Sequence, residues 1–137
     1  MISSLIRMYR AGGFSRIYQE FGNFIYDLIN GVETRKREMG NINPDSNHND
    51  YVTSHKKTII KSLDFVEDNL LNLEPYDFIE IGCGKGKALL LAENYPFKRI
   101  IGYEINNEIF NVLIKNINTK KSNRFVLHNS DLNFEDI

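Results

Sequence analysis

Three short apolar runs alternate with two helical segments between residues 77 and 128, and this alternation constrains the fold more than any other feature. The runs Asp77–Ile81, Arg99–Glu104 and Arg124–His128 are rich in Ile, Val and Phe, which is typical of buried strands. Lys85–Asn94 and Glu108–Ile117 carry apolar residues at helical spacing. Such alternation indicates right-handed βαβ units and a parallel sheet. The sequence therefore predicts an α/β fold with a partial doubly wound, Rossmann-like sheet of about three strands.

The first fifty residues predict helices and a loop instead. Ser3–Tyr9 and Phe14–Ile29 have helical character and are separated by Gly12-Gly13. Residues 31–50 are polar and contain Pro44, which is typical of a loop. We therefore divide the chain into an N-terminal helical segment with a polar loop, residues 1–50, and an α/β unit, residues 51–137.

One more helix is expected at the start of the second unit. Thr53 or Ser54 is a suitable N-cap, and the helical pattern continues to about Leu73. The side chains expected to face inward are Ile59, Ile60, Leu63, Val66, Leu70 and Leu71.

The composition excludes several classes of protein. A chain of 137 residues accommodates one domain and a small appendage. Its net charge of −1 gives no support to a broad nucleic-acid footprint, although Lys115, Lys120, Lys121 and Arg124 form a basic cluster. No apolar run approaches the roughly 20 residues of a membrane span, so we expect no membrane insertion. A single cysteine and the lack of a secretory signal favour the cytoplasm.

The glycine-rich stretch Glu80–Lys87 lies between the first predicted strand and the helix that follows it. Glycines there permit positive φ angles and let a ligand approach the backbone closely. The dinucleotide fingerprint G-x-G-x-x-G fails because Lys87 occupies the third glycine position, and the P-loop pattern fails as well. A nicotinamide-dependent oxidoreductase is therefore disfavoured, and the spacing is acid-x-G-x-G-x-G.

This turn resembles the first motif of the class I S-adenosylmethionine-dependent methyltransferases. That family places an acidic residue at the end of the second strand, matched by Glu104, and often an Asp after the third, matched by Asp131. The resemblance covers residues 51–137. Residues 78–104 look closest to a bacterial group that is distantly similar to the Dot1-like lysine methyltransferases.

The resemblance implies S-adenosyl-L-methionine as the cofactor and assigns roles along the turn. Glu80 would bind the cofactor's amino group, Glu104 the ribose hydroxyls, Ile105 the adenine face and Asp131 the adenine N6 amine. Tyr51 would lie over the methionine end. The cofactor-binding residues expected in this way are Tyr51, Glu80, Gly82, Cys83, Gly84, Gly86, Glu104, Ile105 and Asp131.

The residues also have plainer interpretations. Each carboxylate is also compatible with a solvated strand end, and Tyr51 with a loop aromatic that packs on the core. Cys83 is better explained as a small turn residue than as a nucleophile, because the motif places no base beside it. His48 and His55 are candidate bases but are typical of solvated loop histidines. No catalytic residue and no metal ligand is assigned.

The expected function is methyl transfer from S-adenosylmethionine to an unknown acceptor, which is a protein, a small molecule or a nucleic acid. The alternative is a non-catalytic or vestigial cofactor-binding fragment that needs a partner chain. By resemblance the strand order is third, second, first, and the sheet is incomplete after the third strand. The first strand is then an edge, and an apolar edge is a template for self-association. We therefore expect the chain alone to be catalytically incompetent.

Overall fold

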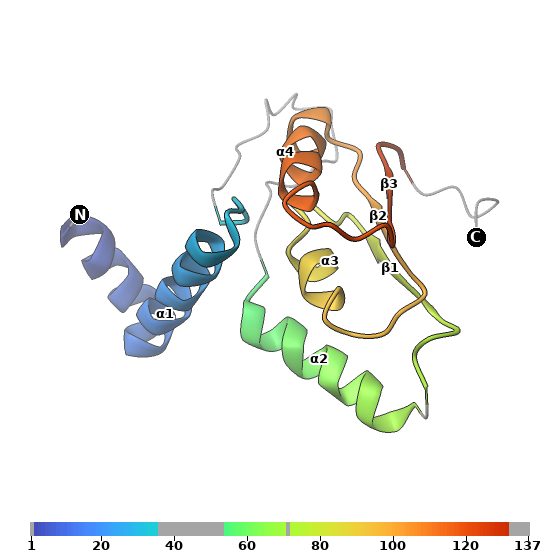
Figure 1. Ribbon diagram of the computed structural model, residues 1–137. Helices are drawn as coiled ribbons and strands as arrows, with labels where there is room; N and C mark the ends of the chain where they lie inside the picture. The colour runs from blue at the N-terminus through green and yellow to red at the C-terminus, as the bar shows by residue number, and fades with distance from the viewer. Residues whose placement is uncertain (1, 36–53, 71, 132–137) are drawn as a thin grey trace.

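The computed structural model describes residues 2–35, 54–70 and 72–131 (Figure 1). Within these residues the strands are β1 (Asp77–Ile81), β2 (Arg99–Tyr103) and β3 (Phe125–His128). All pairings are parallel, and the order β1-β2-β3 is the expected one. The α/β class and the three-stranded Rossmann-like sheet predicted from the sequence are confirmed.

Four helices accompany the sheet in the described part of the chain: α1 (Ile2–Asn30), α2 (Lys56–Asn69), α3 (Lys87–Ala92) and α4 (Asn107–Ile117). Figure 1 shows α2, α3 and α4 on one side of the sheet, with α1 beyond them. The core lies between this layer of helices and the sheet. Its buried apolar side chains include Leu63, Leu73, Leu89, Leu90, Leu91, Ile100 and Leu113.

The expected break at Gly12-Gly13 does not divide α1 into two helices. Gly13 takes a φ of +62°, and the ribbon bends in this part of α1 (Figure 1). Glycine adopts this conformation without a steric penalty, so the helix axis changes direction and α1 still continues to Asn30.

The bounds of α2 also differ from the prediction. The helix begins at Lys56 with His55 at the N-cap, and the His55 side chain does not cap it. It ends at Asn69 because Leu70 adopts extended backbone angles, φ −109° and ψ 132°. Leu70 therefore leaves the inward-facing stripe and is exposed, contrary to expectation, whereas Leu63 is buried as predicted.

The segment that follows α1 is tied to the sheet region. Val32 and Tyr26 belong to the hydrophobic core. The buried Asn116 of α4 accepts from the Glu33 N–H at 2.8 Å and donates to the Glu33 carbonyl at 3.0 Å and the Lys85 carbonyl at 2.9 Å. One amide side chain thus connects the N-terminal segment, α4 and the glycine turn.

Two members of the basic cluster have structural partners. The Arg124 guanidinium donates to the backbone carbonyls of Glu93, Tyr95 and Phe97. Lys120 forms an ion pair with Glu93 at 3.7 Å. Arg124 therefore holds the loop after α3 in place. None of the described helices has the length and apolar character needed to cross a membrane.

Candidate functional site

The glycine turn joins β1 to α3 through three residues with positive φ. Gly82, Gly84 and Gly86 have φ angles of 68°, 56° and 82°. The Cys83 N–H donates to the Tyr103 carbonyl at 2.9 Å, which fixes the turn against the end of β2. A Cβ on Gly86 would lie 2.4 Å from Leu113 Cδ1, so packing against α4 also requires glycine there.

Glu104 follows β2 and reaches the same turn. Its Oε2 accepts from the Gly84 N–H at 2.9 Å, and its Oε1 accepts from the Asn106 N–H at 2.8 Å. The residue is only 8% exposed. A carboxylate has about four acceptor positions, so these two bonds leave acceptor capacity on both oxygens.

Glu80 lies in β1, two residues before Gly82 of the turn. Its Oε2 is buried and has no hydrogen-bond partner among the described residues. Burial raises the pKa of the carboxyl group from 4.5 to about 7. A cavity of about 40 Å³ is lined by Glu80, Gly82, Cys83 and Lys87, among others. An unpaired carboxylate oxygen at such a cavity suits a cationic group, because the group would restore the missing partner.

Two lysines of the turn are buried, which the sequence did not suggest. Lys85 is fully buried, and its Nζ forms an ion pair with Glu33 at 3.0 Å. Lys87 donates to the Ser54 carbonyl at 3.4 Å, and burial lowers its pKa. Both side chains reach segments distant in sequence, so no local pattern could have indicated them.

Cys83 has the environment of a structural thiol. It is buried beneath the turn, and burial raises its pKa to about 12, with smaller contributions from Glu80 and Glu104. Because the thiolate is the nucleophile, a thiol with this pKa is unreactive near neutral pH.

The other expected residues lie at the carboxyl ends of the strands or beyond the described residues. Ile105 is exposed directly after Glu104, and Asp131 is exposed beyond the end of β3. Tyr51 and His48 are outside the described residues. Asn129, which sequence reasoning missed, donates from Nδ2 to the Glu104 carbonyl at 2.9 Å and so joins the ends of β2 and β3.

The raised pKa of Glu80 predicts a pH-dependent stability. Between pH 4.5 and about 7 the folded protein holds a proton that the unfolded chain releases, so the free energy of unfolding falls as pH rises and then levels off. After discounting for partial exposure, we expect a loss of about 2 kcal/mol. Urea unfolding across this range measures it.

Glu80→Gln should flatten this part of the profile, because the amide does not titrate. Glu67→Gln, at an exposed position of α2, is the matched control and should retain the slope. An identical slope in Glu80→Gln and the unmodified chain would contradict the assignment.

Comparison with known proteins shows what this segment is similar to. Residues 74–135 match the model of a family described as "Putative methyltransferase". A solved protein-L-isoaspartate O-methyltransferase shares the fold over 64% of this chain, with 16% identity and a TM-score of 0.51. A StiE O-MT structure matches 53% of this chain with 23% identity and a TM-score of 0.41.

The match covers only part of each of these enzymes. The chain spans 27% of the first and 26% of the second, or about a quarter of their length. No curated protein matches the chain. Residues 74–135, which contain the glycine turn, are therefore similar to a methyltransferase family, and the chain shares the fold of a methyltransferase structure.

Proposed function

We propose that this chain binds S-adenosylmethionine at the glycine turn and serves methyl transfer to an acceptor. The observation that carries the proposal is the placement of Glu80 and Glu104 beside the turn, one with a buried oxygen that has no partner among the described residues and one hydrogen-bonded to Gly84. Two carboxylates suit a ligand with a cationic ammonium and a cationic sulfonium. The two carboxylates therefore fit the cofactor.

Each carboxylate has a separate role in this proposal. Glu80 accepts from the ammonium of the methionine moiety, and this contact favours the charged form of its carboxyl group. Glu104 keeps its backbone contacts and accepts from the ribose hydroxyls with its remaining lone pairs. Ile105 packs on the adenine ring, and Asp131 accepts from its amine.

When bound, the cofactor supplies an activated methyl group on a sulfonium. The contribution of the chain is to fix the cofactor's orientation so that an acceptor can attack in line. A general base is needed only if the acceptor carries a proton at the reacting atom.

The direct test compares two adenosine-containing ligands by titration calorimetry. We expect S-adenosylhomocysteine to bind at least tenfold more tightly than NAD. The reason is that Lys87 occupies the position of the third glycine in the dinucleotide fingerprint G-x-G-x-x-G. Tighter binding of NAD would overturn the proposal. Equal failure of both ligands in a folded chain would also count against it.

A second expectation concerns β1, which pairs only with β2 among the described residues. Ile79 and Ile81 of this strand are 39% and 61% exposed. We propose that two copies of the chain associate through this edge, because an unpaired apolar strand offers backbone donors and acceptors to another strand. Sedimentation should show a mass that rises with protein concentration.

Ile81→Lys should shift this association toward the monomer, because a charged side chain disfavours edge pairing. Ile114→Lys, which adds the same charge at an exposed position of α4, is the matched control and should leave the association unchanged. A monomer at all concentrations, or equal shifts in both variants, would contradict the proposal.

A further inference from the structure

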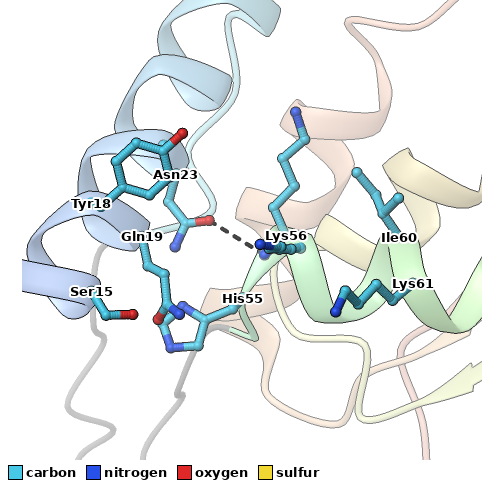
Figure 2. A pocket seen from close by; sticks show the side chains of 10 residues that line it. Ser15, Tyr18, Gln19, Asn23, His55, Lys56, Ile60 and Lys61 are labelled. Atoms are coloured by element: carbon cyan, nitrogen blue, oxygen red, sulfur yellow. Dashed lines mark hydrogen bonds between the residues drawn. The ribbon is translucent and has the colours of Figure 1, made fainter. Parts of the chain in front are cut away.

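A second pocket, separate from the glycine turn, lies between α1 and the start of α2. Its volume is about 530 Å³, within the usual range for small-molecule sites. Figure 2 shows Tyr18, Gln19 and Asn23 of α1 on one side and His55, Lys56 and Lys61 on the other. Nothing in the proposed methyl transfer uses these residues.

Two buried nitrogens at this pocket have no partner among the described residues. Asn23 is only 2% exposed, and its Nδ2 donates to no described acceptor. Its Oδ1 accepts a hydrogen bond from the Lys56 N–H at 3.5 Å, so the side-chain nitrogen is the group of Asn23 without a described partner. The buried His55 Nδ1 likewise has no partner. An unsatisfied donor of this kind costs about 1–3 kcal/mol, which a bound acceptor would recover.

The charged residues that line the pocket all have the same sign. The side chain of His55 does not cap the 14-residue α2, and the Lys56 N–H in its first turn is shared with Asn23 Oδ1, so the positive end of the helix dipole faces this region. Lys56, Lys57 and Lys61 line the pocket, and none of its lining residues is acidic. Lys56 Nζ lies 4.9 Å from the centre of the Tyr26 ring, which leaves Lys57 and Lys61 as the exposed charges.

We propose that this pocket binds the phosphate group of a small organic phosphate monoester. A dianion matches the local excess of positive charge better than a carboxylate does, and helix N-termini bind phosphate through their free N–H groups. The volume exceeds that of phosphate alone, and Tyr18 and Ile60 provide apolar surface for an organic body. Asn23 Nδ2 would donate to a phosphate oxygen.

The test is a nitrogen-15 NMR titration of the whole chain without cofactor. The probes are inorganic phosphate and phenyl phosphate, with sodium chloride at matched ionic strength as the reference. We expect the phosphate probes to shift the amide resonances of Asn23, Lys56 and Lys57, and sodium chloride at the same ionic strength to leave them unchanged. Phenyl phosphate should bind more tightly than inorganic phosphate. Shifts spread over all surface lysines, or none at these amides, would overturn the proposal.

Two variants localise the interaction. Lys61→Glu should weaken phosphate binding about tenfold, because it reverses a charge at the pocket. Lys121→Glu makes the same charge change at an exposed site after α4 and should leave binding unchanged. Asn23→Ala, if its thermal unfolding shows a folded protein, should also weaken binding. Equal weakening by Lys61→Glu and Lys121→Glu would show only non-specific attraction.

Discussion

Glu104→Ala should weaken the binding of S-adenosylhomocysteine by roughly ten- to a hundredfold. The variant loses one or two charge-assisted hydrogen bonds, each of which contributes about 1.5 kcal/mol to binding. A loss of about 1.4 kcal/mol raises the dissociation constant tenfold. Titration calorimetry measures the change in affinity. The residue is placed for this role, since it follows β2 and its carboxylate contacts the Gly84 N–H.

The same contact gives Glu104 a second role, which the experiment must separate from the first. The Glu104 carboxylate accepts from the Gly84 and Asn106 N–H groups, so Glu104→Ala also removes the hydrogen bond that holds the glycine turn. Glu104→Gln keeps the shape and one carbonyl acceptor but removes the charge, and we expect a smaller loss of affinity than with alanine. Circular dichroism reports whether each variant is folded. A folded Glu104→Ala protein with unchanged affinity would mean that Glu104 only stabilises the turn.

The sheet could be predicted from the sequence because its information is local. β1 was predicted with its observed bounds, and β2 and β3 to within one residue at one end. Short runs rich in Ile, Val and Phe are typical of strands, and the glycines mark where β1 ends. Glu104 could be placed near the turn for the same reason, since the carboxyl ends of parallel strands meet at one edge of the sheet.

The contacts that hold the turn could not be predicted in this way. Asn116 lies 83 residues from Glu33 in sequence, and Lys85 lies 52 residues from it, yet all three meet. Their polar side chains in or beside helices are typical of solvated positions, so their burial depends on how α4 packs against the segment after α1. The error at Leu70 has a related cause, since periodicity does not indicate the residue at which a helix unwinds.

Gly86→Ala should lower the free energy of unfolding by about 3 kcal/mol. Part of this cost is backbone strain, because an L-residue at a φ of +82° is disfavoured by about 1–2 kcal/mol. The rest is steric, because the added methyl group would lie 2.4 Å from the buried Leu113 Cδ1, and overpacking typically costs about 1–3 kcal/mol. Urea denaturation of the variant and the unmodified chain gives the difference.

Gly31→Ala separates the two contributions to this loss. Gly31 has a φ of +64°, and a Cβ there would meet nothing within 4 Å, so only the backbone strain remains. We expect a loss of about 1 kcal/mol. A Gly86→Ala, Leu113→Ala double variant should lose less than the sum of its single variants, because removing the leucine side chain relieves the clash. Two outcomes would contradict this explanation: additive losses of unfolding free energy in the double variant, or equal losses in Gly86→Ala and Gly31→Ala. Either would show that the Leu113 side chain moves aside freely, so that close packing against α4 does not require glycine at position 86.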